Sequence, residues 1–221
     1  LNAAKKAGAT IIMDINHLVK ADGTPTLWEN NNVAIAAIKK FLPLANILCP
    51  SHPDDTKNLW GWQTKFEGKE GATALFYFTQ MAFKGSFVIL KNGDKGLQIA
   101  SLANPGNVTP IKALEHPNPD IAKQVPERTG LGDNFMGALA ATLSALGASG
   151  ISHRNAADIR KVVIAATAGS LMAGANLRNK GGCIMSELVP ESENFQEALT
   201  VQLGLLGLNS SLTVAGQAAL R

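Results

Sequence analysis

The sequence predicts an α/β fold in which helices cover both faces of a mostly parallel β-sheet. Short runs of β-branched and apolar residues alternate with segments of helical periodicity along the first half of the chain. These runs are mostly apolar, which is typical of strands that are buried on both faces of a sheet. From residue 133 onward the pattern is almost wholly helical. Strands that alternate with helices in this way favour a parallel sheet with helical layers.

The composition limits the class of protein. Of 221 residues, 46% are apolar and 17% are charged, which excludes a disordered chain or a coiled coil. The formal charge of +3 and the lack of a Lys/Arg cluster give no reason to expect nucleic acid or an anionic membrane as a partner. Cys49 and Cys183 form neither a metal motif nor a disulfide framework, so a reducing compartment and a cytoplasmic location are expected.

The predicted strands lie at residues 9–15, 46–49, 86–90 and 97–100. Each is a short apolar run, and Gly8 and Pro50 bound the first two runs as residues that interrupt regular structure. The Asn-Gly-Asp-Lys-Gly turn at 92–96 predicts that the last two strands form a hairpin. The proline-rich stretch 101–124 is expected to be a loop with one strand near Val108.

Helices are predicted at residues 32–41, 54–59, 70–83, 133–146, 155–175 and 194–207. The first of them closes with Lys39 and Lys40, which suit the negative end of a helix dipole. The chain starts at Leu1 in an apparently helical segment, so we expect a fragment that begins inside a domain. Residues 1–221 are expected to form a single α/β domain.

A glycine-containing segment precedes the long helix near residue 133. Gly130 and Gly132 allow the backbone to turn sharply and to bring several amides to one point, where the helix dipole favours an anion. Asp133 lies at or near the N-cap, so a carboxylate stands beside this site. A bound phosphoryl group with an adjacent base is what transfer to a hydroxyl requires. The alternative is that Asp133 only caps the helix, because Asp is a preferred cap residue.

The segment Thr129-Gly130-Leu131-Gly132-Asp133 resembles the T-G-A-G-D signature of the ribokinase-like (PfkB family) sugar kinases. The resemblance implies a three-layer α/β/α ribokinase-like fold. It also implies that Asp133 is the catalytic base and that the amides of Gly130, Leu131 and Gly132 form the anion hole. Thr129 is expected to contact the nucleotide.

Two upstream pieces resemble the sugar side of the family. Residues 13–16, Met-Asp-Ile-Asn, resemble its D-x-N strand end, and this implies that Asp14 and Asn16 contact the substrate. A structural role in the turn is the alternative for both residues. The Leu-Trp pair at 27–28 matches a feature of 2-keto-3-deoxygluconate kinases, which the chain resembles most within the family.

Another piece resembles the segment that orders water around Mg²⁺ in this family. Residues 42–51 are similar to its "lp-x-a-d-i-l-x-p-s" pattern, which leads into an acidic residue, here Asp54 or Asp55. Ser51 and Asp54 stand where many members have an N-x-x-E pair. Ser51 is therefore expected at the nucleotide, and Asp54 is expected to hold the water shell of the metal.

The hairpin turn resembles the nucleotide-binding V-K-x-G-x-x-G turn of the family over residues 88–96. This implies nucleotide contacts from Lys91, Gly93 and Gly96. Lys91 is otherwise an ordinary solvated lysine at a strand end. Gly93 is expected to supply a positive φ, which also allows a phosphate or ribose to approach closely.

Taken together, the resemblance implies ATP-dependent phosphorylation of a hydroxyl on a sugar or keto-deoxy sugar acid. ATP and Mg²⁺ are the expected cofactors, with a monovalent cation as a further option. The partners are then ATP and a small sugar, and a homodimer is left open. The family's first strands and its β lid have no counterpart here, so the chain is expected to be the C-terminal, nucleotide-binding portion.

An alternative from another class is a non-catalytic nucleotide-binding or oligomerisation module with a decayed kinase fold. Its support is Arg128, Leu131 in place of a small Ala, and Ser51 in place of Asn. Separately, the scattered histidines 17, 52, 116 and 153 are predicted to be surface or loop residues, and the tryptophans 28, 60 and 62 are predicted to be packing groups.

Overall fold

The structure is a computed structural model that describes residues 1–17, 25–62, 68–113 and 130–176, with residues 197, 199–201 and 203–204. It divides into two compact units. The first contains Leu1–Lys112 and Ser149–Ile159, and the second contains Ala113–Ala148 and Arg160–Arg221. The expectation of one domain over the whole chain stays a prediction.

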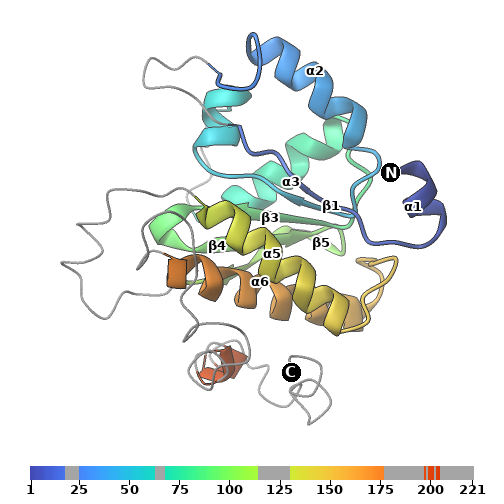
Figure 1. Ribbon diagram of the computed structural model, residues 1–221, viewed down its shortest axis with the longest axis vertical. Helices are drawn as coiled ribbons and strands as arrows, with labels where there is room; N and C mark the ends of the chain where they lie inside the picture. The colour runs from blue at the N-terminus through green and yellow to red at the C-terminus, as the bar shows by residue number, and fades with distance from the viewer. Residues whose placement is uncertain are drawn as a thin grey trace. The chain divides into compact units, whose positions relative to one another are not determined.

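The described strands of the first unit form one sheet in the order β1-β2-β3-β4-β5 (Figure 1). Their bounds are β1 Ile12–Asp14, β2 Ile47–Cys49, β3 Phe87–Lys91, β4 Leu97–Ser101 and β5 Asn104–Ile111. The pairs β1–β2 and β2–β3 are parallel, whereas β3–β4 and β4–β5 are antiparallel. The predicted α/β class, parallel strands and hairpin are therefore confirmed. The stretch after residue 101 contains a longer strand than the sequence indicated.

The helical segments of the first unit are α1 Asn2–Lys6, α2 Asn31–Phe41, the π-helical η1 Asp54–Leu59, α3 Glu70–Gln80 and the short 3₁₀ segment η2 Gly93–Lys95. The sequence explains the ends of α2. Asn30 caps it, because its side-chain oxygen accepts a hydrogen bond from the amide of Val33 at 3.1 Å. Lys39 and Lys40 occupy its last turn, as predicted.

The core of the first unit lies between the helices and one face of the sheet. Ile38 of α2 and Phe78 of α3 pack with Val88 of β3 in one buried hydrophobic cluster. Trp28, Trp60 and Trp62 pack against the same cluster, which confirms their prediction as packing groups. Residues that point to the opposite face of the sheet, such as Ile47, Phe87 and Ile89, are equally buried. Burial on both faces explains why β2 and β3 carry no alternating polar residues.

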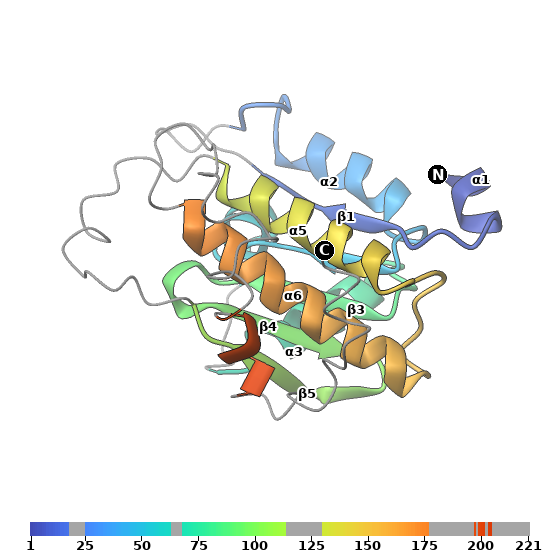
Figure 2. The same cartoon turned by 60° about the horizontal axis from the view of Figure 1, so that its bottom comes forward.

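Two long helices, α5 (Leu131–Ala145) and α6 (Ala156–Asn176), contribute to the second unit and lie side by side (Figures 1 and 2). Gly169 permits their close approach, because a Cβ added there would lie 2.8 Å from the ring of Phe135. Leu199 and Leu203 are buried in the same cluster as α6, and the residues described between 197 and 204 are helical, as predicted. None of the helices in the described part of the chain combines the length and the hydrophobicity that a membrane-spanning segment needs.

Candidate functional site

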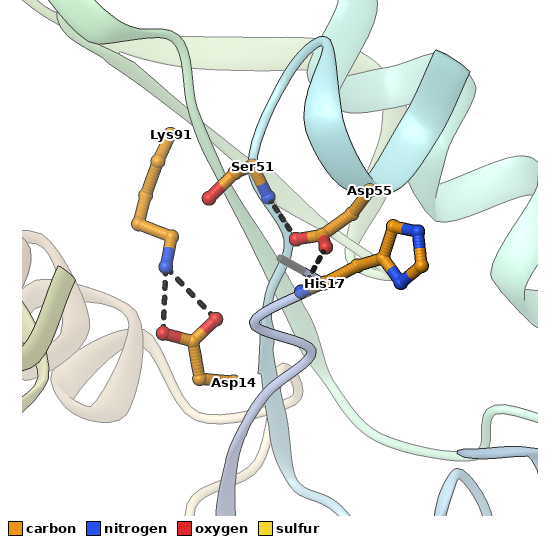
Figure 3. A network of polar contacts seen from close by, with 5 residues as sticks. All are labelled: Asp14, His17, Ser51, Asp55 and Lys91. Atoms are coloured by element: carbon orange, nitrogen blue, oxygen red, sulfur yellow. Dashed lines mark hydrogen bonds and ion pairs between the residues drawn. The ribbon is translucent and has the colours of Figure 1, made fainter. Parts of the chain in front are cut away.

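The carboxyl ends of β1, β2 and β3 lie at one edge of the sheet, because these strands run parallel. Asp14 is the last residue of β1 and Lys91 is the last residue of β3. The Lys91 ammonium donates to both carboxylate oxygens of Asp14, at 2.8 and 2.7 Å (Figure 3). Their side chains are 15% and 17% exposed, respectively. The structure thus joins a predicted nucleotide contact and a predicted substrate contact into one ion pair.

A second carboxylate at this edge, Asp55, connects the segments that follow β1 and β2. Its two oxygens accept hydrogen bonds from the backbone amides of Ser51, at 2.6 Å, and His17, at 2.9 Å (Figure 3). Asp55 is fully buried, and this burial raises its pKa to about 7, although the two amides and Lys91 act in the opposite direction. Because the two hydrogen bonds come from the backbone of His17 and Ser51, Asp55 holds together the segments that follow β1 and β2.

Asp54, predicted to hold the water shell of a metal, is placed differently from its neighbour. It is exposed, and its carboxylate accepts a hydrogen bond from the side-chain amide of Asn58 at 3.2 Å. Successive residues of a helical segment point in different directions, so only one of the two aspartates in η1 faces inward. The described residues contain no group of three or more His, Cys, Asp or Glu side chains that could hold a metal. The role of Asp54 stays a prediction.

His17 was predicted to be a surface or loop residue: it lies in a loop, as predicted, but it is not at the surface. It is 3% exposed, and its imidazole ring points away from the Asp14–Lys91 pair (Figure 3). Within the described part of the chain, neither ring nitrogen has a hydrogen-bond partner. Burial lowers the pKa of this imidazole, and the nearby Asp54 carboxylate opposes the change. A histidine three residues beyond a strand carries no local signal of burial, so sequence reasoning missed it.

Asn16 adopts a left-handed backbone conformation, with φ of 48°, and its side chain is exposed. Asn tolerates this conformation better than most residues, which favours the structural role that the sequence left open. The predicted contact between Asn16 and the substrate stays a prediction.

The turn after Lys91 has the backbone geometry that its glycines predicted. Gly93 and Gly96 have φ of 55° and 84°, and the Asn92 amide donates to the Gly96 carbonyl at 2.8 Å. Ser51 forms an isolated parallel bridge with Lys91. The predicted nucleotide contacts Ser51, Lys91 and Gly93 therefore belong to one corner of the sheet edge.

The N-terminus of α5 in the second unit is formed by the glycine-containing segment. Gly130, with φ of 84°, is the N-cap, and no side chain caps the helix there. Leu131 and Gly132 follow, and Asp133 is the third helical residue with an exposed side chain. Asp133 is thus not the N-cap, so a capping role at that position is wrong. Thr129 lies outside the described residues.

This arrangement suits an anion. The first amides of a helix have no partner within the helix, and the dipole places partial positive charge at the same end. Without a side-chain cap, the amides at residues 130–132 are suited to phosphate oxygens. A carboxylate in the first turn can then act on a group bound beside it.

Comparison with solved structures identifies the fold. An aminoimidazole riboside kinase from Salmonella enterica, complexed with aminoimidazole riboside and an ATP analog, matches with a TM-score of 0.64 and 20% identity, over 90% of this chain and 55% of that chain. A ribokinase from Giardia lamblia matches with a TM-score of 0.60 and 18% identity, over 90% and 53%. A ribokinase from Arabidopsis thaliana, complexed with ribose and ATP, matches with 0.55 and 20%, over 90% and 50%.

The chain therefore has a ribokinase-like α/β fold, as the sequence predicted. It spans about half the length of the matched structures. No family model and no curated protein matches it.

Proposed function

We propose that this chain is part of a carbohydrate kinase that transfers the γ-phosphoryl group of ATP to a hydroxyl of a sugar or keto-deoxy sugar acid. The observation that carries the proposal is the N-terminus of α5, where an exposed Asp133 stands in the first turn of a helix with no side-chain cap. The proposal is supported by two of the matched structures, which have a similar fold: the aminoimidazole riboside kinase is complexed with aminoimidazole riboside and an ATP analog, and the Arabidopsis thaliana ribokinase with ribose and ATP.

The residues of this chain would divide the work of phosphoryl transfer. Asp133 would accept the proton of the attacking hydroxyl, which makes its oxygen a better nucleophile. The amides of Gly130, Leu131 and Gly132 would stabilise the negative charge on the transferring phosphoryl oxygens. The γ-phosphorus–oxygen bond to ADP breaks as the bond to the sugar oxygen forms.

The sheet edge of the first unit would bind the nucleotide. Lys91 supplies an ammonium at the edge where open α/β sheets bind ligands. Ser51, which forms a β-bridge with Lys91, and Gly93 and Gly96, which form the turn after it, are further proposed nucleotide contacts. Thr129 is a further proposed nucleotide contact.

Mg²⁺ would fit this chemistry, because it is commonly held by one or two carboxylates together with waters and substrate phosphates. The exposed carboxylate of Asp54 is the residue we assign to its water shell. When bound, the ion would neutralise charge on the phosphates. A monovalent cation, a homodimer and a cytoplasmic location are retained as further proposals.

A second candidate function is a non-catalytic nucleotide-binding module. The observation that favours it is that both carboxylate oxygens of Asp14, a predicted substrate contact, are occupied by Lys91. This module would bind ATP without transferring its phosphoryl group.

The test is phosphoryl transfer from γ-labelled ATP to a panel of sugars and keto-deoxy sugar acids, with the longest available version of the protein. Asp133→Asn is expected to reduce turnover by about 10²–10⁴-fold, because it removes the general base. Nucleotide binding, measured by titration, is expected to survive. Glu197→Gln, which alters an exposed carboxylate elsewhere in the second unit, is the matched control.

Unchanged turnover in Asp133→Asn would show that this residue is not the base. ATP binding without transfer to any acceptor would favour the non-catalytic module.

A further inference from the structure

We propose that Asp14 is an exchangeable counter-ion for Lys91, and that it competes with a polyphosphate for the lysine ammonium. On this view Asp14 sets the affinity of the sheet edge for anions, and direct contact with the sugar is not its main task. The inference rests on the proposed function, which places Lys91 at the phosphates of a nucleotide.

The geometry makes the ammonium the movable part of this site. The Lys91 amide donates to the Pro50 carbonyl at 2.8 Å, and the Lys91 carbonyl accepts from the His52 amide at 2.8 Å. The main chain of Lys91 is therefore held on the strand, whereas its ammonium lies at the end of a flexible four-carbon side chain. A rotation of that side chain can transfer the ammonium to a ligand without moving the sheet.

The pair reaches across the middle strand of the edge. Asp14 ends β1 and Lys91 ends β3, and Cys49 of β2 lies between the two strands in register with Asp14. Burial raises the pKa of the Cys49 thiol well above its usual range, so this group is uncharged. The thiol therefore supplies no negative charge to compete with Asp14 for the ammonium.

The partial exposure of the Asp14 and Lys91 side chains would allow an anion to replace Asp14 at the ammonium. At 15% and 17% exposure, the two side chains are shielded enough for their attraction to matter, yet they reach the surface where an anion can arrive. The other carboxylate of the network, Asp55, uses both oxygens for backbone amides. It holds the backbone and is not available as a substitute for Asp14.

Three possible roles for Asp14 therefore lead to different predictions. A counter-ion competes with phosphate and also repels it, so the loss of its charge strengthens polyphosphate binding. A residue that only contacts sugar leaves polyphosphate affinity unchanged. A residue that orients Lys91 toward the ligand weakens binding when it is removed.

The experiment is calorimetric titration of tripolyphosphate, without nucleoside or sugar, into the 221-residue chain at fixed low ionic strength. Asp14→Asn is expected to bind about tenfold more tightly than the wild type. Lys91→Met is expected to bind at least about tenfold more weakly. Glu29→Gln, which removes an exposed negative charge elsewhere in the first unit, is expected to stay within about twofold.

Each outcome decides the matter. Equal or weaker binding by Asp14→Asn, with Lys91→Met still impaired, overturns the counter-ion role and leaves the proposed nucleotide site intact. Unimpaired binding by Lys91→Met overturns the counter-ion role together with the assignment of Lys91 to the nucleotide. No binding by any folded variant removes the proposed nucleotide site as well. Circular dichroism checks the fold, and Asp14→Ser replaces Asp14→Asn if the latter does not fold.

Discussion

The sheet edge of the first unit and the N-terminus of α5 in the second unit are both proposed here to bind phosphate, yet they are built from different groups. At the sheet edge, each charged side chain already has a partner within the protein: Lys91 pairs with Asp14, and Asp55 accepts hydrogen bonds from two backbone amides. At α5, a left-handed Gly130 begins the helix, no side chain caps it, and Asp133 is exposed.

The difference follows from burial. A buried charge is costly unless it has a partner, so the groups at the sheet edge must be paired before any ligand arrives. The end of a helix can instead be hydrated until an anion replaces the water. Binding at the sheet edge therefore requires rearrangement of side chains, whereas binding at α5 does not.

The largest change in stability is expected from the titration of Asp55, the most buried carboxylate of the sheet edge. Its folded-state pKa of about 7 lies above its ordinary value of 3.8. Between these values the folded protein binds a proton more readily than the unfolded chain. The stabilisation from this group is therefore complete below about pH 4 and is lost as the pH rises through 7. The loss is at most about 4 kcal/mol, because one pKa unit corresponds to about 1.4 kcal/mol.

Asp55→Asn removes this titration, so the variant should gain stability relative to the wild type as the pH rises from 4 to 8. Urea unfolding across this range measures the difference in the free energy of unfolding. Asp54→Asn, one residue away and exposed, is the control, and its free energy of unfolding should change with pH as that of the wild type does. If the free energy of unfolding of Asp55→Asn had the same pH dependence as that of the wild type, burial would not raise the pKa of Asp55 at the sheet edge.

A smaller loss of stability is expected at Gly169, where α5 and α6 of the second unit approach closely. Gly169→Ala places a methyl group 2.8 Å from the Phe135 ring and 3.0 Å from the Phe135 carbonyl oxygen. We expect a loss of about 1–3 kcal/mol, because α5 and α6 must separate to accept the group. Thermal unfolding monitored by circular dichroism measures it.

Gly137→Ala on α5 is the matched control, since an added Cβ there meets nothing within 4 Å. It should stabilise the protein by about 0.5–1 kcal/mol through helix propensity. Equal effects of the two alanines would contradict close packing of the helices at Gly169.

The smallest change in stability is expected at Gly93, and it tests whether the left-handed backbone of the turn after Lys91 requires a glycine. Gly93 has φ of 55°, and a Cβ added there would meet nothing within 4 Å, so Gly93→Ala should cost about 1 kcal/mol through conformation alone. Gly106→Ala has the same open space and no positive φ, and should be close to neutral. Chemical unfolding measures the free energy of unfolding of both variants. If Gly93→Ala were as neutral as Gly106→Ala, the left-handed backbone at Gly93 would not contribute to the stability of the sheet edge.

Local patterns allowed much of the fold to be predicted. Short, mostly apolar runs identified β1 to β4, and helical periodicity identified α2, α3, α5 and α6, because both signals depend on near neighbours. The positive φ of Gly93 was predicted for the same reason. The glycine-containing segment before Asp133 was placed at a helix start, although the cap proved to be Gly130.

Sequence patterns were enough to predict the chain order of the strands and helices, the glycine turns and the aspartate at the start of α5. The pairing of Asp14 with Lys91, 77 residues away, the inward direction of Asp55 rather than Asp54, and the burial of His17 became visible in the folded chain. These features depend on strand register and on the rotational phase of a short helical segment. Such quantities are set by packing between distant parts of the chain, which local periodicity does not record.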